Sequence, residues 1–389
     1  MAIQNTLKNL CIKEPLWLQQ RRQEAFRKFA SLPKQSFKYG TSILMDTHDL
    51  NLDEIKHNEL IQGLSAKCND SRIEIMSLHE AFEKYKDLTE KHFGSLILEE
   101  DKVVALHMAL WNKGLFIKIP KNIELNDPIE INTLVNSQRQ FECILVVAED
   151  NTKATILEDV RSNLEEGYRS NVVEIIIGNN SQIQYGSLQS ISLKFYNFVI
   201  NRAKVGNDSR IEWFSGTFGS KFTRLESTSL LNGKGSSAKN LGAFFASSSQ
   251  QFDIFTSAIH AAPNTTSDML VKGVAKDKAK SLYRGLIEIK ENAPNSDGYQ
   301  KQDTLLLNEG IEANAIPQLL IGNNEVRCTH GATIGQIDRN KIFYLMSRGL
   351  SEEEAKQTLV KGFFTPLIEK ISNEKIKDYI ELIVEQRLK

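Results

Sequence analysis

The sequence predicts a mainly β protein in which stacked β-coils lie between two helical regions. Short β-rich runs bounded by Gly, Asn, Asp or Pro succeed one another from residue 114 onward, and a turn-and-hydroxyl pattern recurs among them at nearly constant spacing. Helical periodicity is confined to the two ends of the chain. We therefore expect a mixed and helical region at 1–110, a β-coil core at 111–337 and a helical region at 338–389.

Composition excludes several classes of partner. The net charge is −1, with 48 basic and 49 acidic residues, so no global charge favours nucleic acid or an anionic bilayer. No apolar run reaches the length of a membrane span, and the first residues lack the apolar segment of a secretory signal, so we expect a cytoplasmic protein. The cysteines show no CxxC spacing and are expected to be free thiols: Cys11, Cys68, Cys143 and Cys328.

Helices are predicted near the amino terminus. Pro15 suits the first turn of a helix. A stripe at helical spacing follows it: Leu18, Arg22, Phe26, Phe29 and Leu32. Ser77 is a suitable N-cap for a second helix, because the following residues SLHEAFEKYKDL place apolar side chains at helical spacing.

A repeat in the middle of the chain indicates the β-coils. The segments NTKATI, NSQIQY, DSRIEW and GSSAKN align so that each begins with a turn residue followed by Thr or Ser. The aligned hydroxyl residues are 29, 28 and 27 positions apart: Thr152, Ser181, Ser209 and Ser236. A strand-only repeat of this length is typical of a solenoid. An antiparallel sandwich with evenly spaced hairpins is the alternative, although two-residue Asn-Gly and Asp-Gly hairpin signals are scarce.

The carboxyl-terminal region carries clear helix boundaries. Ile342, Leu345 and Met346 have helical spacing, and Gly349 is a natural C′ residue that ends this helix. Residues 351–354 have the pattern of a capping box that opens the next helix. A final amphipathic helix is predicted from one apolar face: Ile376, Tyr379, Ile380 and Ile383.

The common catalytic motifs are absent from the sequence. It contains no GxxxxGK[ST] phosphate loop and no HExxH, GxSxG or GxGxxG segment. Nucleotide hydrolysis, zinc proteolysis and dinucleotide binding therefore have no local support. A β-helical carbohydrate lyase or hydrolase remains as an alternative by fold analogy alone, since no pair of carboxylates stands out.

Cys328 and His330 form the strongest chemical candidate. In a strand, residues two apart project from the same face, so this thiol and imidazole would lie side by side and could bind a soft metal or share a proton. Two ligands are too few for a complete site, which leaves the rest to a partner chain. The alternative is structural, a half-buried Cys beside a hydrogen-bonded His.

Other conspicuous residues are interpreted as structural. Trp111 and Trp213 are expected to pack in the core, with stacking on a flavin or base as the alternative. We expect Arg284 to be solvated and His260 to cap a turn, and the polar run at 293–303 to be an exposed loop.

The segment CTHGATIGQIDRNKIFYLMSRGLSEEEAKQTLVKGF (residues 328–363) resembles the carboxyl-terminal signature of the SufB/SufD family, SHGAT.G.ID...LFYL.SRG....A...L..GF. Further stretches carry the same resemblance: EPLWLQQRRQEAFRKF at 14–29, ALWNKGLFIKIPKNIELNDPIEI at 109–131, HAAPNTTSD at 260–268 and YRGLIEI at 283–289. The similarity spans nearly the whole chain, apart from a weak match at 45–90.

The resemblance implies a right-handed parallel β-helix that works with SufB and the SufC ATPase in iron-sulfur cluster assembly. It places the nascent cluster or its iron at an interface with SufB, where Cys328 and His330 match the Cys and His of SufD proteins. It also implies that the carboxyl-terminal helices bind SufC. Further implications are a homodimer of the isolated chain and FAD binding in the complex. The candidate SufC-binding residues are Phe343, Tyr344, Arg348 and Phe363.

Two departures favour the SufD type over the SufB type. SufB carries its essential Cys in a QCD.LL context, whereas the matching segment QKQDTLLL has Gln302 at that position. SufB also has Glu directly after the His of its EHEAT segment, where this chain has Gly331. The resemblance therefore predicts a scaffold subunit that is not itself an enzyme.

Overall fold

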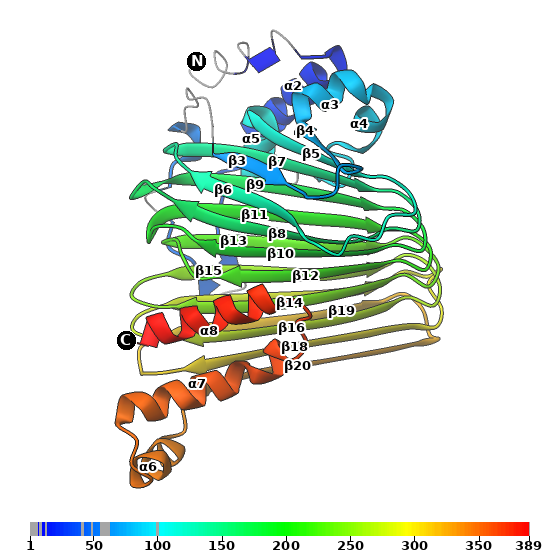
Figure 1. Ribbon diagram of the computed structural model, residues 1–389. Coiled ribbons are helices and arrows are strands. Elements are labelled where there is room, and N and C mark those ends of the chain that lie inside the picture. Colours follow the sequence, from blue (N-terminus) through cyan, green and yellow to red (C-terminus); the bar gives the residue numbers. More distant parts are fainter. Residues whose placement is uncertain are drawn as a thin grey trace.

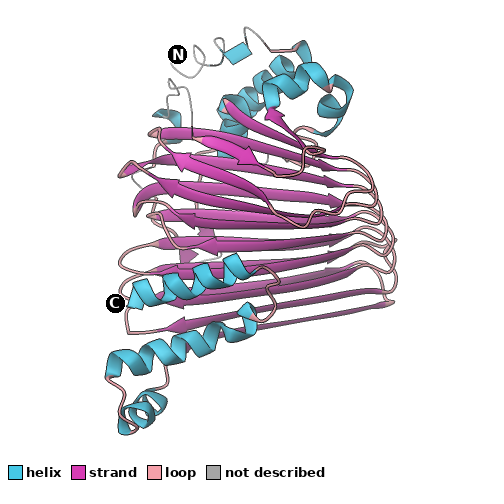
Figure 2. Cartoon of the chain, viewed as in Figure 1, coloured by secondary structure: helices cyan, strands magenta, loops and turns pink. Residues whose placement is uncertain are grey.

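The computed structural model describes residues 14–39, 43–47, 50–54, 63–98 and 101–388, together with residues 7, 10 and 11. Two nine-stranded sheets face each other and form a β-solenoid (Figure 1), and the helices lie at its first coils and along one sheet (Figure 2). The predicted parallel β-helix with helices at both ends is confirmed. None of the helices in this part of the chain has the length and hydropathy that a membrane span requires.

Each coil contributes one strand to each sheet, and from β5 onward each strand pairs in parallel with the strand two places later. The even sheet is composed of β3 (Leu64–Lys67), β6 (Ile129–Val135), β8 (Lys153–Ser162), β10 (Gln182–Ser190), β12 (Arg210–Thr217), β14 (Ser237–Ala246), β16 (Thr266–Ala275), β18 (Ser296–Leu306) and β20 (Val326–Gln336). The odd sheet is composed of β4 (Glu74–Ser77), β5 (Lys113–Ile119), β7 (Arg139–Ala148), β9 (Glu166–Ile177), β11 (Lys194–Val205), β13 (Phe222–Leu231), β15 (Gln251–His260), β17 (Lys280–Ile289) and β19 (Glu312–Ile321).

The repeated hydroxyls form a ladder along one corner of the solenoid. The backbone N–H of Thr152 donates to Ser181 Oγ (3.0 Å), and the N–H of Ser181 donates to Ser209 Oγ (2.9 Å). The preceding turn residues adopt positive φ, which short polar residues tolerate: Asn151, Asn180 and Asp208. The aligned repeat of the sequence is therefore the repeat of the fold.

The interior of the solenoid combines an apolar core with one buried ionic cluster. Trp213 is fully buried and its Nε1 donates to Ser229 Oγ (3.1 Å), as expected for a core tryptophan. Arg169 pairs with Glu142 (2.8 Å) and Glu158 (3.2 Å), and all three side chains are at most 2% exposed. Burial raises the pKa of Glu142. This cluster places two buried carboxylates against one guanidinium.

The amino-terminal region closes the first coil. It contains α2 (Leu16–Ser31), α3 (Leu78–Lys84), α4 (Lys86–His92) and α5 (Lys102–Leu110). The strands β3 and β4 pair antiparallel with β6 and β5, and Ser77 and Glu80 form the capping box of α3. Arg22 is buried, pairs with Glu14 (2.6 Å) and lies over the Trp111 ring. The strands β3 and β4 thus occupy the edges of β6 and β5, and the helices lie over this end of the solenoid (Figure 1).

A buried carboxylate ties the loop after α4 to the odd sheet. Glu174 accepts hydrogen bonds from the backbone N–H groups of Gly94 (2.5 Å) and Leu96 (2.9 Å). Burial raises the pKa of Glu174 to about 7, against the effect of these hydrogen bonds. The loop and the sheet are thus joined by a group that titrates near neutral pH.

The carboxyl-terminal region forms three helices, of which the second and third lie along the outer face of the even sheet (Figure 1). They are α6 (Arg339–Ser347), α7 (Glu352–Ile368) and α8 (Glu374–Leu388). Ile376 of α8 packs over Gly186, where an added Cβ would lie 2.8 Å from Ile376 Cδ1. The predicted helix signals are confirmed, because Gly349 has φ 98° and Ser351 and Glu354 form a capping box.

Two predictions about the late coils are wrong. Much of the polar run at 293–303 belongs to β18 rather than to an exposed loop, because its alternate side chains face the interior. Arg284 is not solvated, since it pairs with buried Asp253 (2.9 Å) on the outer face of the odd sheet. His260 does lie at a turn, where its ring contacts Thr265 Oγ1 (2.8 Å) and Ser267 Oγ (2.9 Å).

The hydroxyl ladder predicts a clear difference between two substitutions of Ser209. Ser209→Ala leaves the buried N–H of Ser181 without its acceptor, so we expect a loss of about 1–3 kcal/mol in the free energy of unfolding. Ser209→Thr keeps the hydroxyl, and Thr152 shows that Thr fits this column. Urea unfolding followed by circular dichroism measures both variants. An equal loss in the two would show that the hydroxyl is not responsible.

Candidate functional site

The last coil leaves the solenoid open at its carboxyl-terminal end. In the part of the chain that the structure describes, β20 pairs only with β18 and β19 only with β17, so each has one unpaired edge. Apolar side chains are exposed beside these edges, with Leu320 at 54%, Ile321 at 45% and Ile334 at 39%. An unpaired strand edge with exposed apolar side chains is suited to pairing with another chain.

Cys328 and His330 lie on β20, on the side that faces the interior in earlier coils. Cys328 aligns with Gly298 of β18, and His330 aligns with Gln300, which is fully buried. Cys328 is half-buried and packs with Ile287 and Val326, whereas His330 is exposed because no further coil covers it. The predicted placement of both residues on one face is thus realised at the open end.

The thiol of Cys328 is held in its protonated form. Burial, followed by the negative charge of Asp297, raises its pKa to about 11. A thiolate is the species that binds metal or attacks an electrophile, so Cys328 in the isolated chain is a weak ligand at neutral pH. A cation that approaches the open end would favour the thiolate.

The two residues do not complete a metal site within this chain. Among the described residues, no three His, Cys, Asp or Glu side chains are grouped closely enough to hold a metal ion. A bound iron or cluster at Cys328 and His330 would therefore take its remaining ligands from another molecule. The open strand edges are the surface on which such a molecule could pair.

The burial of the neighbouring glutamines was not predicted, because both lie in the polar run that the sequence predicts to be an exposed loop. Gln300 and Gln302 are 1% exposed and line the interior just inside the open end. Gln300 Nε2 donates to the carbonyl oxygen of Gln318 (3.0 Å) and thereby bridges the two sheets. The sequence did contain a signal for a strand here, because Asn295 and Ser296 repeat the turn-and-hydroxyl pattern of the earlier coils. In the structure, Ser296 Oγ contacts Thr265 Oγ1 (2.8 Å).

A second thiol and imidazole pair lies under α5. His107 Nε2 is 3.3 Å from Cys143 Sγ, and His107 Nδ1 is 2.8 Å from Ser170 Oγ. Burial lowers the pKa of His107 to about 3 and raises that of Cys143 well above its ordinary value. Because all three groups are neutral and enclosed, they stabilise the packing of α5 and do not form a reactive centre.

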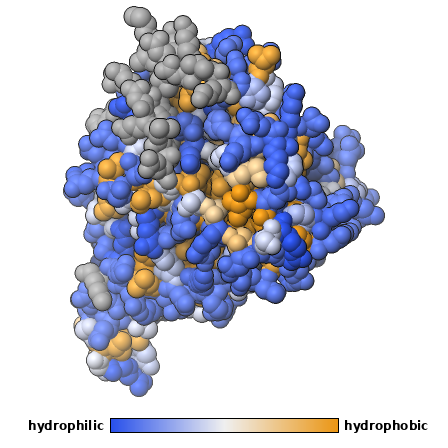
Figure 3. Space-filling view, turned by 45° about the horizontal axis from the view of Figure 1, so that its top comes forward, coloured by the Kyte–Doolittle hydropathy of each residue, from blue (hydrophilic) through white to orange (hydrophobic). Residues whose placement is uncertain are grey.

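The helix α6 projects beyond the last coil and carries an exposed apolar patch. The α6 patch is formed by Phe343 (73% exposed), Tyr344 (55%) and Met346 (43%), and the Arg348 guanidinium lies 5.2 Å from the Tyr344 ring centroid. Hydrophobic atoms are visible on this projecting unit at the lower left of Figure 3.

Phe363 lies apart from the α6 patch. It is half-buried on α7, where Lys272 Nζ lies 4.2 Å from its ring centroid and pairs with Asp303 (3.0 Å). Phe363 therefore fixes α7 on the even sheet. Of the four candidate partner residues, it is the one placed within a packed contact.

Two family models match the sequence. The SUF system FeS cluster assembly, SufBD core domain, matches residues 131–363, and the SufBD protein N-terminal region matches residues 58–131. An iron-sulfur cluster assembly SufBD family protein of Staphylococcus aureus (strain MRSA252) is 32% identical over 344 residues, which cover 87% of this chain and 70% of that protein. One of Staphylococcus saprophyticus is 31% identical over 317 residues, which cover 80% and 68% respectively.

The surroundings of Cys328 predict its reactivity. Iodoacetamide should alkylate Cys328 slowly at neutral pH, with a rate that rises as the pH approaches about 11, because only the thiolate reacts. Asp297→Asn removes a negative charge that raises this pKa and should speed alkylation at pH 8. Mass spectrometry of the Cys328 peptide measures the rate.

A matched control is available on the same coil. Glu309→Gln changes an exposed carboxylate in the turn after β18, and should leave the rate of Cys328 alkylation unchanged. If Asp297→Asn reacts no faster than the control, the charge of Asp297 does not govern the thiol.

Proposed function

Because the chain belongs to the SufBD family of iron-sulfur cluster assembly proteins, we propose that it is a SufD-type scaffold subunit of a cluster assembly complex. In this proposal it acts in the cytoplasm with SufB and the SufC ATPase. It contributes surface and ligands and does not catalyse a reaction by itself. Iron or a nascent cluster is the cargo of the complex.

The open end of the solenoid is the observation that carries this proposal. It combines two unpaired strand edges with a thiol and an imidazole that are too few to hold a metal alone. A partner with the same solenoid could extend the sheets by parallel or antiparallel pairing and bring further ligands to Cys328 and His330. SufB is such a partner in this proposal, and a second copy of the chain could take its place in isolation.

The interior near the open end supports the SufD type. Gln302 stands where the SufB pattern has its essential Cys, and its side chain is buried between the sheets and donates to Thr304 Oγ1. An amide is neither a nucleophile nor a thiolate ligand, so it cannot accept sulfur as a cysteine does. Gly331 likewise offers no carboxylate beside His330. A scaffold that complements a cysteine-bearing partner fits both substitutions.

The α6 patch supports an interaction with SufC. Exposed aromatic side chains beside an arginine are typical of the residues that dominate protein interfaces. The patch projects beyond the last coil, so a protein bound there would lie beside whatever pairs with the open end (Figure 1). ATP-driven movement of such a protein could thus be transmitted to the interface that contains Cys328.

Reconstitution of the complex tests the scaffold role. The chain should co-purify with SufB and with SufC, and the double variant Phe343→Ser and Tyr344→Ser should weaken SufC binding at least about tenfold, since exposed aromatic anchors carry much of the affinity. Leu193→Ser is the matched control, because this 43% exposed residue lies in the distant turn between β10 and β11. Absence of a stable complex with either protein would contradict the proposed role.

The ligand role of His330 needs a separate measurement. His330→Ala should leave the complex assembled, because the side chain is exposed and packs against little. It should slow cluster formation, followed by absorbance and by activation of an apo acceptor protein. Unchanged cluster formation in the intact complex would restrict His330 and Cys328 to a structural role.

A further inference from the structure

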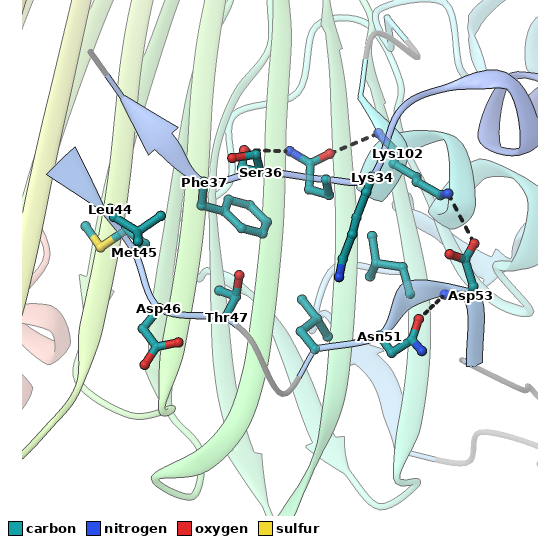
Figure 4. A pocket seen from close by; sticks show the side chains of 13 residues that line it. Lys34, Ser36, Phe37, Leu44, Met45, Asp46, Thr47, Asn51, Asp53 and Lys102 are labelled. Atoms are coloured by element: carbon teal, nitrogen blue, oxygen red, sulfur yellow. Dashed lines mark hydrogen bonds and ion pairs between the residues drawn. The ribbon is translucent and has the colours of Figure 1, made fainter. Parts of the chain in front are cut away.

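An amino-terminal strap crosses the outer face of the odd sheet and reaches β15 and β17. The strap is formed by the described residues 33–39, 43–47 and 50–54, which include β1 (Lys38–Tyr39), β2 (Ile43–Leu44) and the 3-10 turn η1 (Leu52–Glu54). The backbone N–H of Met45 donates to the carbonyl oxygen of Phe37 (3.1 Å) and joins the two arms. Beyond this bond the arms diverge over the sheet (Figure 4).

The strap is anchored to the sheet at several points. Gln251 Oε1 accepts from the backbone N–H of Asp46 (2.7 Å), and Gln251 Nε2 donates to the Asp46 carbonyl oxygen (2.9 Å). Tyr39 donates to buried Asp253, and the Phe37 ring centroid lies 5.1 Å from that of Phe222. These contacts hold the two arms apart in a fixed position.

A cavity of about 240 Å³ lies between the arms. Its floor is apolar, since Phe37, Met45 and Leu52 line it and are at most 5% exposed. Its rim is polar and carries Lys34, Thr47 and other hydrophilic side chains. This volume is below the range of about 300–1,000 Å³ that is usual for drug-sized ligands, so only a small molecule would fit.

Among the described residues, the charges around the cavity leave one cation without an acidic partner. Lys102 Nζ pairs with Asp53 (3.1 Å), so these two groups neutralise each other. The Asp46 carboxylate points away from the space between the arms, whereas Lys34 extends into it (Figure 4). Within the described part of the chain, no acidic side chain pairs with Lys34. An ammonium group beside an apolar floor favours a ligand with one anionic end and one apolar end.

We propose that the strap and the odd sheet form a binding site for a small amphipathic carboxylate. Its apolar body lies on Phe37 and Leu52, and its carboxylate pairs with Lys34. Because the ligand contacts both arms, its binding would hold the strap closed on the sheet. The cavity is lined by no residue of β18, β19 or β20, so the site is independent of the role proposed for the open end.

Octanoate is a suitable probe, because it has about ten non-hydrogen atoms and a single carboxylate. A ligand of this size should bind the full-length chain with a Kd on the order of 1 mM, as measured by isothermal titration calorimetry or ligand-observed NMR. Octylamine has the same apolar body with the opposite charge and should bind at least about tenfold more weakly.

Two substitutions separate this site from general charge attraction. Lys34→Met keeps an apolar stem and removes the ammonium, and should weaken octanoate binding about tenfold. Lys38→Met removes the same charge from an exposed position of the strap that does not line the cavity, and should leave the affinity unchanged. Matching thermal unfolding midpoints establish that both variants are folded.

Three results would overturn the proposal. They are equal affinity of the Lys34→Met variant and the unchanged chain, binding of octylamine as tight as that of octanoate, and no saturable binding of octanoate at millimolar concentration. None of them depends on a cluster assembly partner, so none bears on the scaffold role.

Discussion

The left-handed residue at one corner of successive coils is the constraint on which the rest of the structure depends. A tight turn into the next strand requires positive φ, and Asn151, Asn180 and Asp208 supply it in three successive coils. The hydroxyls of Ser181 and Ser209, which follow the second and third of these turn residues, each accept a hydrogen bond from the backbone of the preceding coil. The turns therefore stack in one column. Parallel strands that start from a stacked column are in register, and every side chain therefore has neighbours of equivalent position one coil earlier and one coil later.

This register decides what the open end can present. Cys328 continues a column that runs through Ser267 and Gly298, and Gly298 leaves room for its sulfur, since an added Cβ would lie 3.3 Å from Sγ and 2.9 Å from Ile287. The thiol can thus rest partly inside the solenoid while the imidazole of His330, one position further along the face, remains in solvent. A half-covered thiol beside an exposed imidazole is a consequence of ending the stack at this coil.

The sequence contained the fold because the determining signals are local. The turn-and-hydroxyl repeat, the capping boxes at Ser77 and Ser351 and Gly349 each act over a few residues, and the same is true of the spacing that places Cys328 and His330 on one face. The features that were missed depend on contacts between distant residues. Gln300 reaches the opposite sheet, and Tyr39 meets a carboxylate 214 positions away, which no local pattern encodes.

One covered end and one open end limit how many molecules can join. At the first coil, the short strands β3 and β4 pair with β6 and β5 and the helices lie over this end (Figure 1), whereas nothing in the described part of the chain pairs with the free edges of β19 and β20. A solenoid open at both ends would grow by stepwise addition, as a bifunctional monomer does in a condensation polymer. This molecule corresponds to a monofunctional chain stopper: association through its open strand edges would end once two open ends have met, and would give a pair rather than a fibre.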